Sequence, residues 1–597
     1  MLGVLMLTGA RVASQPSSAS RPDLDVAYVS LEPRYPAYDT LITEGVPLLL
    51  DVATREPLPP NGKDPVRRWP KKGEKVTATG RVVNHGAAPS GPFRYVWLVD
   101  GKKADTGQHA GLEPDCVAEA ETVEWRLEGA KLRQARLRPG TYADFSYTFS
   151  WKKGQRIELR LEPAGVGPEE QNAANNSREE RTDALAFAVL VRRSAYNRWA
   201  QLSVSDTSRS FEDWVHAQFA ALYQKLERSA YASAPGGVRQ PLRVDLIRVL
   251  DDAEPAASFD AVHAANGWDG YVDFTDSSDP ATRAGKVDWE LLRGVAHQIG
   301  LVDLSALRVL PEANAVKDAA GQLAAIGYQP ASAFGFADGL LPEHSVQALN
   351  RLEGTRRGYP GIYLYDVPRA CRLRVLDNNG RAVPGTALSV FEARTGRIED
   401  QPIAEGKTDT NGEWTLPNRP APPVKTPNGF ELTDNPFGKI DLNGGNGLLL
   451  VRIAARGETE YQWLPITLFN SAFWRGQTAL ATFDLRTRLP VPQAPAAPTQ
   501  VAVPRSGIAI DQVPLSWTPS VDPKVVAYFI YRGRYPGYDW ERVGTVAAPR
   551  AHYTDDAAPP LGGSLRLRYA VSAVDLQGNE SGLARLPKDV IVYSSDE

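Results

Sequence analysis

The hydrophobic and polar positions of this chain follow two different periods. Apolar and polar residues alternate before residue 192, most clearly in the segments Val76–Gly86, Tyr95–Lys103, Thr141–Trp151 and Arg156–Pro163. Alternation of period two, bounded by Asn-His-Gly and Asp-Gly turns, is typical of antiparallel strands with one buried face. We therefore expect residues 23–192 to form a β-sandwich.

The spacing becomes helical after residue 194. Ser210 and Asp213 are placed to cap a helix whose apolar residues share one face: Val215, Phe219, Leu222 and Leu226. Two strands and two further helices complete an expected α+β module: strands Leu242–Leu250 and Gly270–Phe274, and helices that begin after Asp288 and at Pro342.

Strand patterns return from residue 370 to residue 489 and again after a proline-rich linker. The expected fold class is multidomain and mainly β, with three antiparallel β-sandwiches around one α+β domain. The expected boundaries are 1–22 for a signal-like or disordered start, 23–192, 194–366, 370–489, 490–498 for the linker, and 499–597.

Length, composition and charge agree with this division. A chain of 597 residues is too long for one hydrophobic core, so about four domains are expected. The net charge is −4 with both signs mixed, and no basic stripe is available to neutralise phosphates. Nucleic acid is therefore excluded as an expected partner.

The first residues indicate secretion or the cell surface. The short apolar run before Gln15 resembles a signal peptide without its basic region, and the true start could lie upstream of Met1. We expect no transmembrane segment, because no apolar run has the length of a membrane-spanning helix. Cys116 and Cys371 fall in different expected domains, so we expect two buried free thiols.

One motif carries possible chemistry. In the segment LLRGVAHQIGLVD, His297, Gly300 and Asp303 match the extended zinc-peptidase pattern, but Arg293 stands at the first ligand and Gly294 at the general base. The segment resembles a degenerate zincin of the metzincin class, although His297 could also be an ordinary histidine near a helix end. The metzincin methionine turn is missing as well, since both methionines lie at the extreme N-terminus.

This resemblance implies a pseudoenzyme. We expect no catalytic residue, no cofactor and no bound metal, with His297 and Asp303 as the remaining ligand candidates. Arg293 is expected within salt-bridge reach of Asp303, in the place that a zinc ion would take.

The other modules resemble extracellular families. The first resembles the immunoglobulin-like CARDB adhesion module in its motifs at Val83–Gly86, Val99–Gly101, Leu137–Gly140 and Glu170–Asn176, with an insertion at Thr54–Lys72.

The last two modules have their own motifs. Residues 370–489 resemble a carboxypeptidase-regulatory-like, prealbumin-like sandwich, in which Asp377 and Asp409 are expected to form turns. Residues 499–597 resemble a fibronectin type III domain, with Trp517 as the core tryptophan and Tyr569 as the tyrosine corner.

Three functions remain open. The first is a non-catalytic binding or adhesion protein with an extracellular protein or polysaccharide partner. The second is an active zinc peptidase that recruits His216 or His344. The third is a carbohydrate-binding protein that uses Tyr535, Tyr538 and Trp540, although these aromatics could equally be local packing. No phosphate-binding loop and no nucleophile elbow occurs in the sequence.

Overall fold

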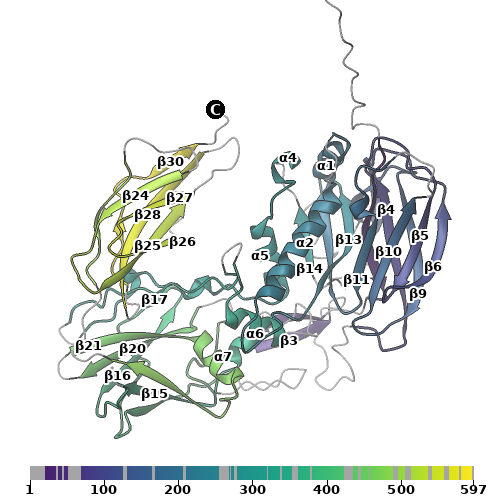
Figure 1. The fold of residues 1–597 in the computed structure, drawn as a ribbon. Helices are drawn as coiled ribbons and strands as arrows, with labels where there is room; N and C mark the ends of the chain where they lie inside the picture. The colour runs from purple at the N-terminus through teal and green to yellow at the C-terminus, as the bar shows by residue number, and fades with distance from the viewer. Residues whose placement is uncertain are drawn as a thin grey trace, which may run out of the picture.

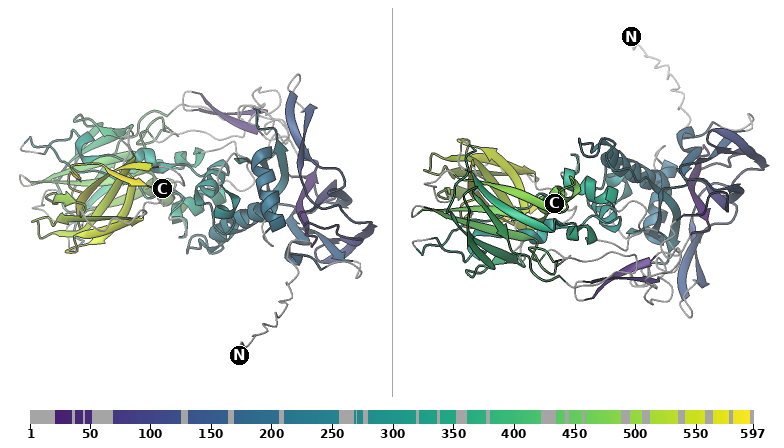
Figure 2. Two further views of the ribbon diagram at one scale, coloured as in Figure 1. Left: turned by 90° about the horizontal axis from the view of Figure 1, so that it is seen from above. Right: turned by 90° about the horizontal axis from the view of Figure 1, so that it is seen from below.

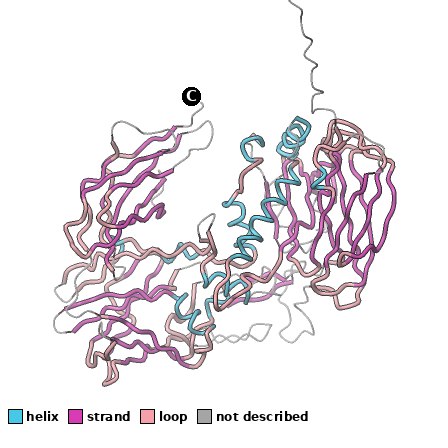
Figure 3. The backbone as a smooth tube through the Cα atoms, viewed as in Figure 1, coloured by secondary structure: helices cyan, strands magenta, loops and turns pink. Residues whose placement is uncertain are grey.

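The structure is a computed structural model of the full chain. It describes residues 21–34, 38–43, 46–51, 69–124, 131–163, 169–205, 210–254, 268, 270–274, 279–318, 321–335, 339–351, 361–376, 380–421, 434–441, 445–455, 458–487, 495–504, 512–534, 541–556, 564–576 and 580–593. Strand-rich regions lie at both ends of the molecule, and most helices gather between them (Figures 1, 2 and 3).

The first region is a β-sandwich, as the alternating pattern predicts. One antiparallel sheet has the order β1(Leu24–Glu32), β4(Lys75–Asn84), β9(Tyr142–Ser150). The other has the order β11(Ser177–Arg181), β10(Arg156–Pro163), β5(Phe93–Val99), β6(Lys102–His109). Trp97 and Leu159 fill the space between the sheets, and a Cβ at Gly80 would lie 2.3 Å from Leu159 Cδ2. Glycine at that position permits this close approach.

A mixed sheet forms the centre of the molecule. Its order is β14(Gly270–Phe274), β12(Leu185–Arg192), β13(Leu242–Leu250), β8(Lys131–Leu137), β7(Ala118–Glu124). Strands β14, β12 and β13 run parallel, whereas β8 is antiparallel to β13 and β7 to β8.

This sheet crosses the boundary expected between residues 192 and 194. Strands β7, β8 and β12 precede that boundary but pair within the central sheet, and helix α1(Arg193–Ser205) follows β12 without a linker. The sequence of β12, LAFAVLVR, has an almost unbroken apolar run, and seven of its eight residues are buried. Such a strand is covered on both faces and belongs inside a layered domain.

The other helices and short elements surround the central sheet and lead to the next region. They are α2(Phe211–Arg228), α4(Pro280–Arg283), α5(Trp289–Gln298), α6(Glu343–Arg351), η2(Ala173–Asn175), η3(Leu304–Leu307), η4(Pro311–Ala313), η5(Ile362–Tyr365) and a hairpin of β2(Tyr38–Thr43) with β3(Val46–Asp51). Ser210 Oγ accepts a hydrogen bond from Asp213 N at 2.9 Å, which confirms the predicted cap of α2.

Residues 370–487 form two further sheets. One has the order β19(Glu413–Leu416), β15(Ala370–Leu376), β22(Leu480–Arg486). The other contains β17(Arg397–Ile398), β16(Ala387–Arg394), β20(Leu448–Ala455) and β21(Glu458–Pro465), with β18(Ala404–Lys407) also on β16. The expectation of a purely antiparallel sandwich is wrong here, because β15 and β22 are parallel. Parallel neighbours need a crossover, and α7(Ile466–Trp474) lies in that connection.

The last region has the strand order of a fibronectin type III sandwich. One sheet is β23(Thr499–Ala502), β24(Gln512–Thr518), β27(His552–Asp556). The other is β26(Glu541–Ala547), β25(Val525–Arg534), β28(Ser564–Asp575), β29(Ala584–Arg585), with β30(Val590–Tyr593) also on β28. Trp517 packs in this core against Tyr528, while Tyr569 Oη donates to Asp555 Oδ2 at 2.7 Å.

Three general expectations can be compared with the structure. Cys116 and Cys371 are both buried free thiols, as predicted. Among the described residues, no helix is long and apolar enough to cross a membrane. Asp409 Oδ1 accepts from the backbone N–H groups of Asn411 and Glu413, as a turn former does, whereas Asp377 lies outside the described residues.

Candidate functional site

The motif helix forms as its sequence predicts. Asp288 caps α5 by accepting from Leu291 N at 3.0 Å, and the helix ends at Gln298. Gly300 follows with φ of 112°, a left-handed conformation that favours glycine and turns the chain away from the helix. The turn brings Asp303 back toward the helix.

The expected ion pair is present. Arg293 Nη2 lies 2.8 Å from Asp303 Oδ2, with exposed side-chain fractions of 37% and 44%. Asp303 also caps η3 through Ser305 N at 2.9 Å. Burial would raise the pKa of Asp303, but Ser305, Arg293 and His297 together lower it. The carboxylate therefore already has cationic and hydrogen-bonding partners.

The remaining motif residues offer little chemistry. His297 Nδ1 lies 2.6 Å from Leu301 O, so only its other nitrogen could face a ligand. Gly294 is exposed, and a Cβ there would meet no atom within 4 Å. A glutamate would fit at that position, so no steric reason accounts for the glycine there.

The alternative ligands are occupied elsewhere. His216 Nε2 lies 2.7 Å from Ala27 O, and His344 Nε2 lies 3.2 Å from Asn470 Oδ1. Burial lowers the pKa of His344 to about 4. The candidate sugar-binding residues Tyr535, Tyr538 and Trp540 lie outside the described residues.

A second constellation lies between the first sandwich and helix α2. Asp25 on β1, His85 after β4 and Glu212 in the first turn of α2 are all buried, with 0%, 1% and 2% exposure. One ligand atom from each lies within 4.8 Å of the others, and no other group of this kind occurs among the described residues. His85 Nε2 lies 3.1 Å from Glu212 Oε2 and 3.7 Å from Asp25 Oδ2.

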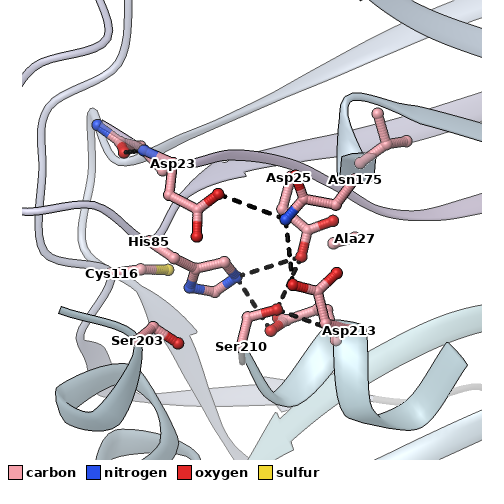
Figure 4. A network of polar contacts seen from close by, with 12 residues as sticks. Asp23, Asp25, Ala27, His85, Cys116, Asn175, Ser203, Ser210 and Asp213 are labelled. Carbon is pink, nitrogen blue, oxygen red and sulfur yellow. Dashed lines mark hydrogen bonds and ion pairs between the residues drawn. The ribbon is translucent and has the colours of Figure 1, made fainter. Parts of the chain in front are cut away.

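Further polar groups surround these three side chains. Figure 4 shows His85 directed at Asp25, with Asp23, Asn175, Ser210 and Asp213 around them. Ser210 Oγ donates to Asp25 Oδ2 at 2.9 Å, and Asn175 Nδ2 donates to Asp213 Oδ2 at 3.1 Å. We call Asp23, Asp25, His85, Glu212 and Asp213 the buried cluster.

The buried cluster has strongly displaced proton affinities. Burial raises the pKa of Asp23 to about 6, and burial together with Asp213 raises that of Asp25 well above its usual range. Burial would lower the pKa of His85, but Glu212, Asp25 and Asp23 raise it to about 9. Burial would likewise raise the pKa of Glu212, which His85 and Tyr196 hold below its usual value. The cluster contains more carboxyl groups than cations, so its carboxyl groups compete with one another for protons.

A cavity of about 170 Å³ adjoins the buried cluster. Glu212 and Tyr196 line it, together with three arginines: Arg81, Arg136 and Arg248. Tyr196 Oη donates to Glu212 Oε1 at 2.9 Å. Glu212 therefore contributes both to this cavity and to the buried cluster.

The sequence contained an indirect signal for this region. Two motifs of the CARDB resemblance, Val83–Gly86 and Glu170–Asn176, both border the buried cluster: the first contains His85 and the second contains Asn175. Both motifs are explained locally as turns. Asp25, His85 and Glu212 come from three distant segments, so no spacing rule predicts that they meet. The sequence interpretation did not identify His85 or Glu212.

Comparisons with known proteins give no family. No family model matches the chain, and no curated protein matches it. A chain of titin kinase and its flanking domains is 21% identical over 17% of this chain and 18% of its own, with a TM-score of 0.14. The FN3 domain of human collagen XX is 21% identical over 16% of this chain and 95% of its own, with a TM-score of 0.13. The chicken CNTN1 FN1–FN3 domains are 11% identical over 37% of this chain and 59% of their own, with a TM-score of 0.15. The chain spans about a fifth of the titin kinase chain, and TM-scores this low establish no common fold.

Proposed function

We propose that the chain is a non-catalytic binding or adhesion protein of the cell exterior, with a central domain derived from a zinc peptidase. The observation that carries the proposal is the contact of Arg293 with Asp303 at 2.8 Å, beside Gly294. A catalytic zinc needs three protein ligands, a water and a general base. A guanidinium paired to the third ligand disfavours a dication, and glycine moves no proton.

Binding is supported by the arrangement of the modules. β-Sandwiches lie at opposite ends of the molecule (Figure 2), and each presents surface away from the central layer. The expected partner is an extracellular protein or a polysaccharide. The CARDB-like, degenerate zincin-like and carboxypeptidase-regulatory-like assignments belong to this proposal, as do secretion and surface location.

The resemblance to a zincin can be tested by restoring the missing chemistry. The double substitution Arg293→His/Gly294→Glu should create a zinc site with His297 and Asp303, because both new side chains face open space on α5. The matched control is Arg293→Ala/Gly294→Ala, which changes the same two positions without adding a metal ligand or a base. Zinc uptake is measured by equilibrium dialysis in the wild type and in both variants.

Wild-type protein should hydrolyse no unstructured peptide, with or without added zinc. Chelator-sensitive peptide hydrolysis by the wild type would contradict the proposal. Equal zinc uptake by the restored variant and its control would refute the zincin ancestry while leaving the non-catalytic function standing.

A further inference from the structure

The buried cluster has the composition of a metal site that the sequence pattern does not reveal. We propose that Asp25, His85 and Glu212 hold a divalent zinc-class ion that fastens the first sandwich to helix α2. This site differs from the motif on α5 in residues, in elements and in burial.

The ligand spacing fits a small dication. Two donors about 2.0–2.2 Å from a tetrahedral zinc lie roughly 3.4 Å apart. The distances from His85 Nε2 to Glu212 Oε2 and to Asp25 Oδ2 are 3.1 and 3.7 Å, on either side of that value. A zinc ion therefore needs only small side-chain shifts.

The donor atoms keep lone pairs that no hydrogen bond uses, although Asp25 Oδ2 also accepts from Ser210 Oγ at 2.9 Å. Both ring nitrogens of His85, Asp25 Oδ1 and Glu212 Oε2 are buried without a hydrogen-bond partner. His85 Nε2 and Glu212 Oε2 contact each other as an ion pair. Buried polar atoms are normally satisfied, so the unpartnered His85 Nε2 and Glu212 Oε2, which lie 3.1 Å apart, fit a shared cation.

Charge balance indicates a cation. The buried cluster contains one imidazole, three fully buried carboxyl groups from Asp23, Asp25 and Glu212, and the partly buried carboxyl group of Asp213. The neighbouring cation is Arg178, whose Nη2 lies 3.9 Å from Asp25 Oδ1. Buried charges require pairing or a metal, and a dication would supply the missing positive charge.

The surrounding groups orient the ligands as supporting residues of metal sites do. Tyr196 Oη donates to Glu212 Oε1 and Ser210 Oγ donates to Asp25 Oδ2. These bonds fix two carboxylates in place. Imidazole and carboxylate donors suit Zn²⁺, with Mn²⁺ as the next candidate of the same donor chemistry.

Burial assigns the ion a structural role. Each proposed ligand is at most 2% exposed, whereas a catalytic zinc keeps an open position for water or substrate. The ion would connect strands β1 and β4 of the sandwich to the first turn of α2. The adjoining cavity reaches Glu212 and offers a route for loading.

The experiment uses the full chain produced in zinc-supplemented medium and dialysed against metal-free buffer. Elemental analysis should find about one zinc per chain, and X-ray absorption at the zinc edge should show one imidazole among oxygen donors. Wild type without stoichiometric zinc or manganese would overturn the proposal, as would a zinc environment with sulfur or several imidazoles. The spectrum needs no variant and remains decisive if variants fail to fold.

Variants locate the ion. His85→Gln and Asp25→Asn should each lower the zinc affinity roughly tenfold or more. His216→Gln is the matched control, because it changes a partly buried histidine one turn from Glu212 on α2, and it should leave the zinc content unchanged. Zinc retained by His85→Gln overturns the site.

The result also separates this inference from the proposed function. Zinc lost from His297→Gln but kept by His85→Gln would place the ion at the α5 motif and contradict both proposals. Absence of zinc in every protein would overturn the buried site alone.

Discussion

The α5 motif and the buried cluster differ in what identifies them. The motif has a spacing that can be read from one segment, yet its ligand positions contain a guanidinium and a glycine. The buried cluster has no sequence spacing, yet it concentrates one imidazole and three carboxyl groups away from solvent, with Asp213 beside them. A motif-like spacing in one segment therefore does not imply a working site, while the stronger chemical constellation arises only in three dimensions.

The largest effect on the free energy of unfolding is expected from a substitution in the buried cluster. Replacing His85 with alanine leaves Asp25 and Glu212 facing each other without their imidazole. Removing one partner of a buried charge pair costs about 3–5 kcal/mol, so the free energy of unfolding should fall by that amount. Urea denaturation followed by tryptophan fluorescence measures it.

The control is His109→Ala, which alters a partly exposed histidine of the same sandwich and should cost far less. Equal losses in the two variants would show that the buried cluster contributes no more than a surface residue.

The second largest effect is the pH dependence of stability caused by Glu180, which is buried where the first sandwich contacts the central sheet. Burial raises the pKa of Glu180 to about 8, despite Arg178 and Arg243. The folded state therefore keeps this proton from pH 4.5 to 8 while the unfolded state loses it, and stability falls as the pH rises through that window. Glu180→Gln should remove the part of this loss of stability that the titration of Glu180 causes. At pH 8 the free energy of unfolding of the variant should exceed that of the wild type by an amount on the order of 3 kcal/mol.

Denaturation at several pH values checks this prediction. Near pH 4.5 the variant and wild type should be almost equal in stability. Glu179→Gln, on the exposed face of the same strand, serves as the control. A gain that stays constant between pH 4.5 and 8 would show that Glu180 does not titrate as described.

A smaller effect is expected on the motif helix. Gly294→Ala should raise the free energy of unfolding by about 1 kcal/mol, because alanine is the better helix former and its Cβ meets no atom within 4 Å. A thermal unfolding scan detects the gain. Destabilisation would mean that the glycine serves a contact or a ligand at this surface.

The smallest effect should be the loss of the ion pair itself. Arg293→Ala removes a contact between two half-exposed side chains, and such pairs contribute about 0–1 kcal/mol. Double-mutant cycles with Asp303→Asn measure the coupling. A coupling above 2 kcal/mol would make the pair a structural element of the domain.

Local features could be predicted from the sequence, and long-range pairing could not. The caps at Ser210 and Asp288, the turn at Gly300 and the contact of Arg293 with Asp303 depend on residues within a few turns of each other. The parallel pairing of β15 with β22 joins segments more than 100 residues apart, and local periodicity does not encode such a partner.

The buried cluster escaped prediction for the same reason. Asp25, His85 and Glu212 belong to a strand, a turn and a helix, and each has a local interpretation that accounts for it. Only the packing of β1 and α2 brings them within 4.8 Å. The apolar run of strand β12 lies before the change in periodicity, although β12 pairs with β13 and β14 in the central sheet.

The zinc content of His297→Gln, compared with wild type, tests the central claim most directly. The account predicts no change, because the α5 motif has no ligand at its first position and no general base, and Arg293 forms an ion pair with Asp303. A loss of zinc on this substitution alone would show a working metal site on α5 and contradict the assignment of a non-catalytic domain.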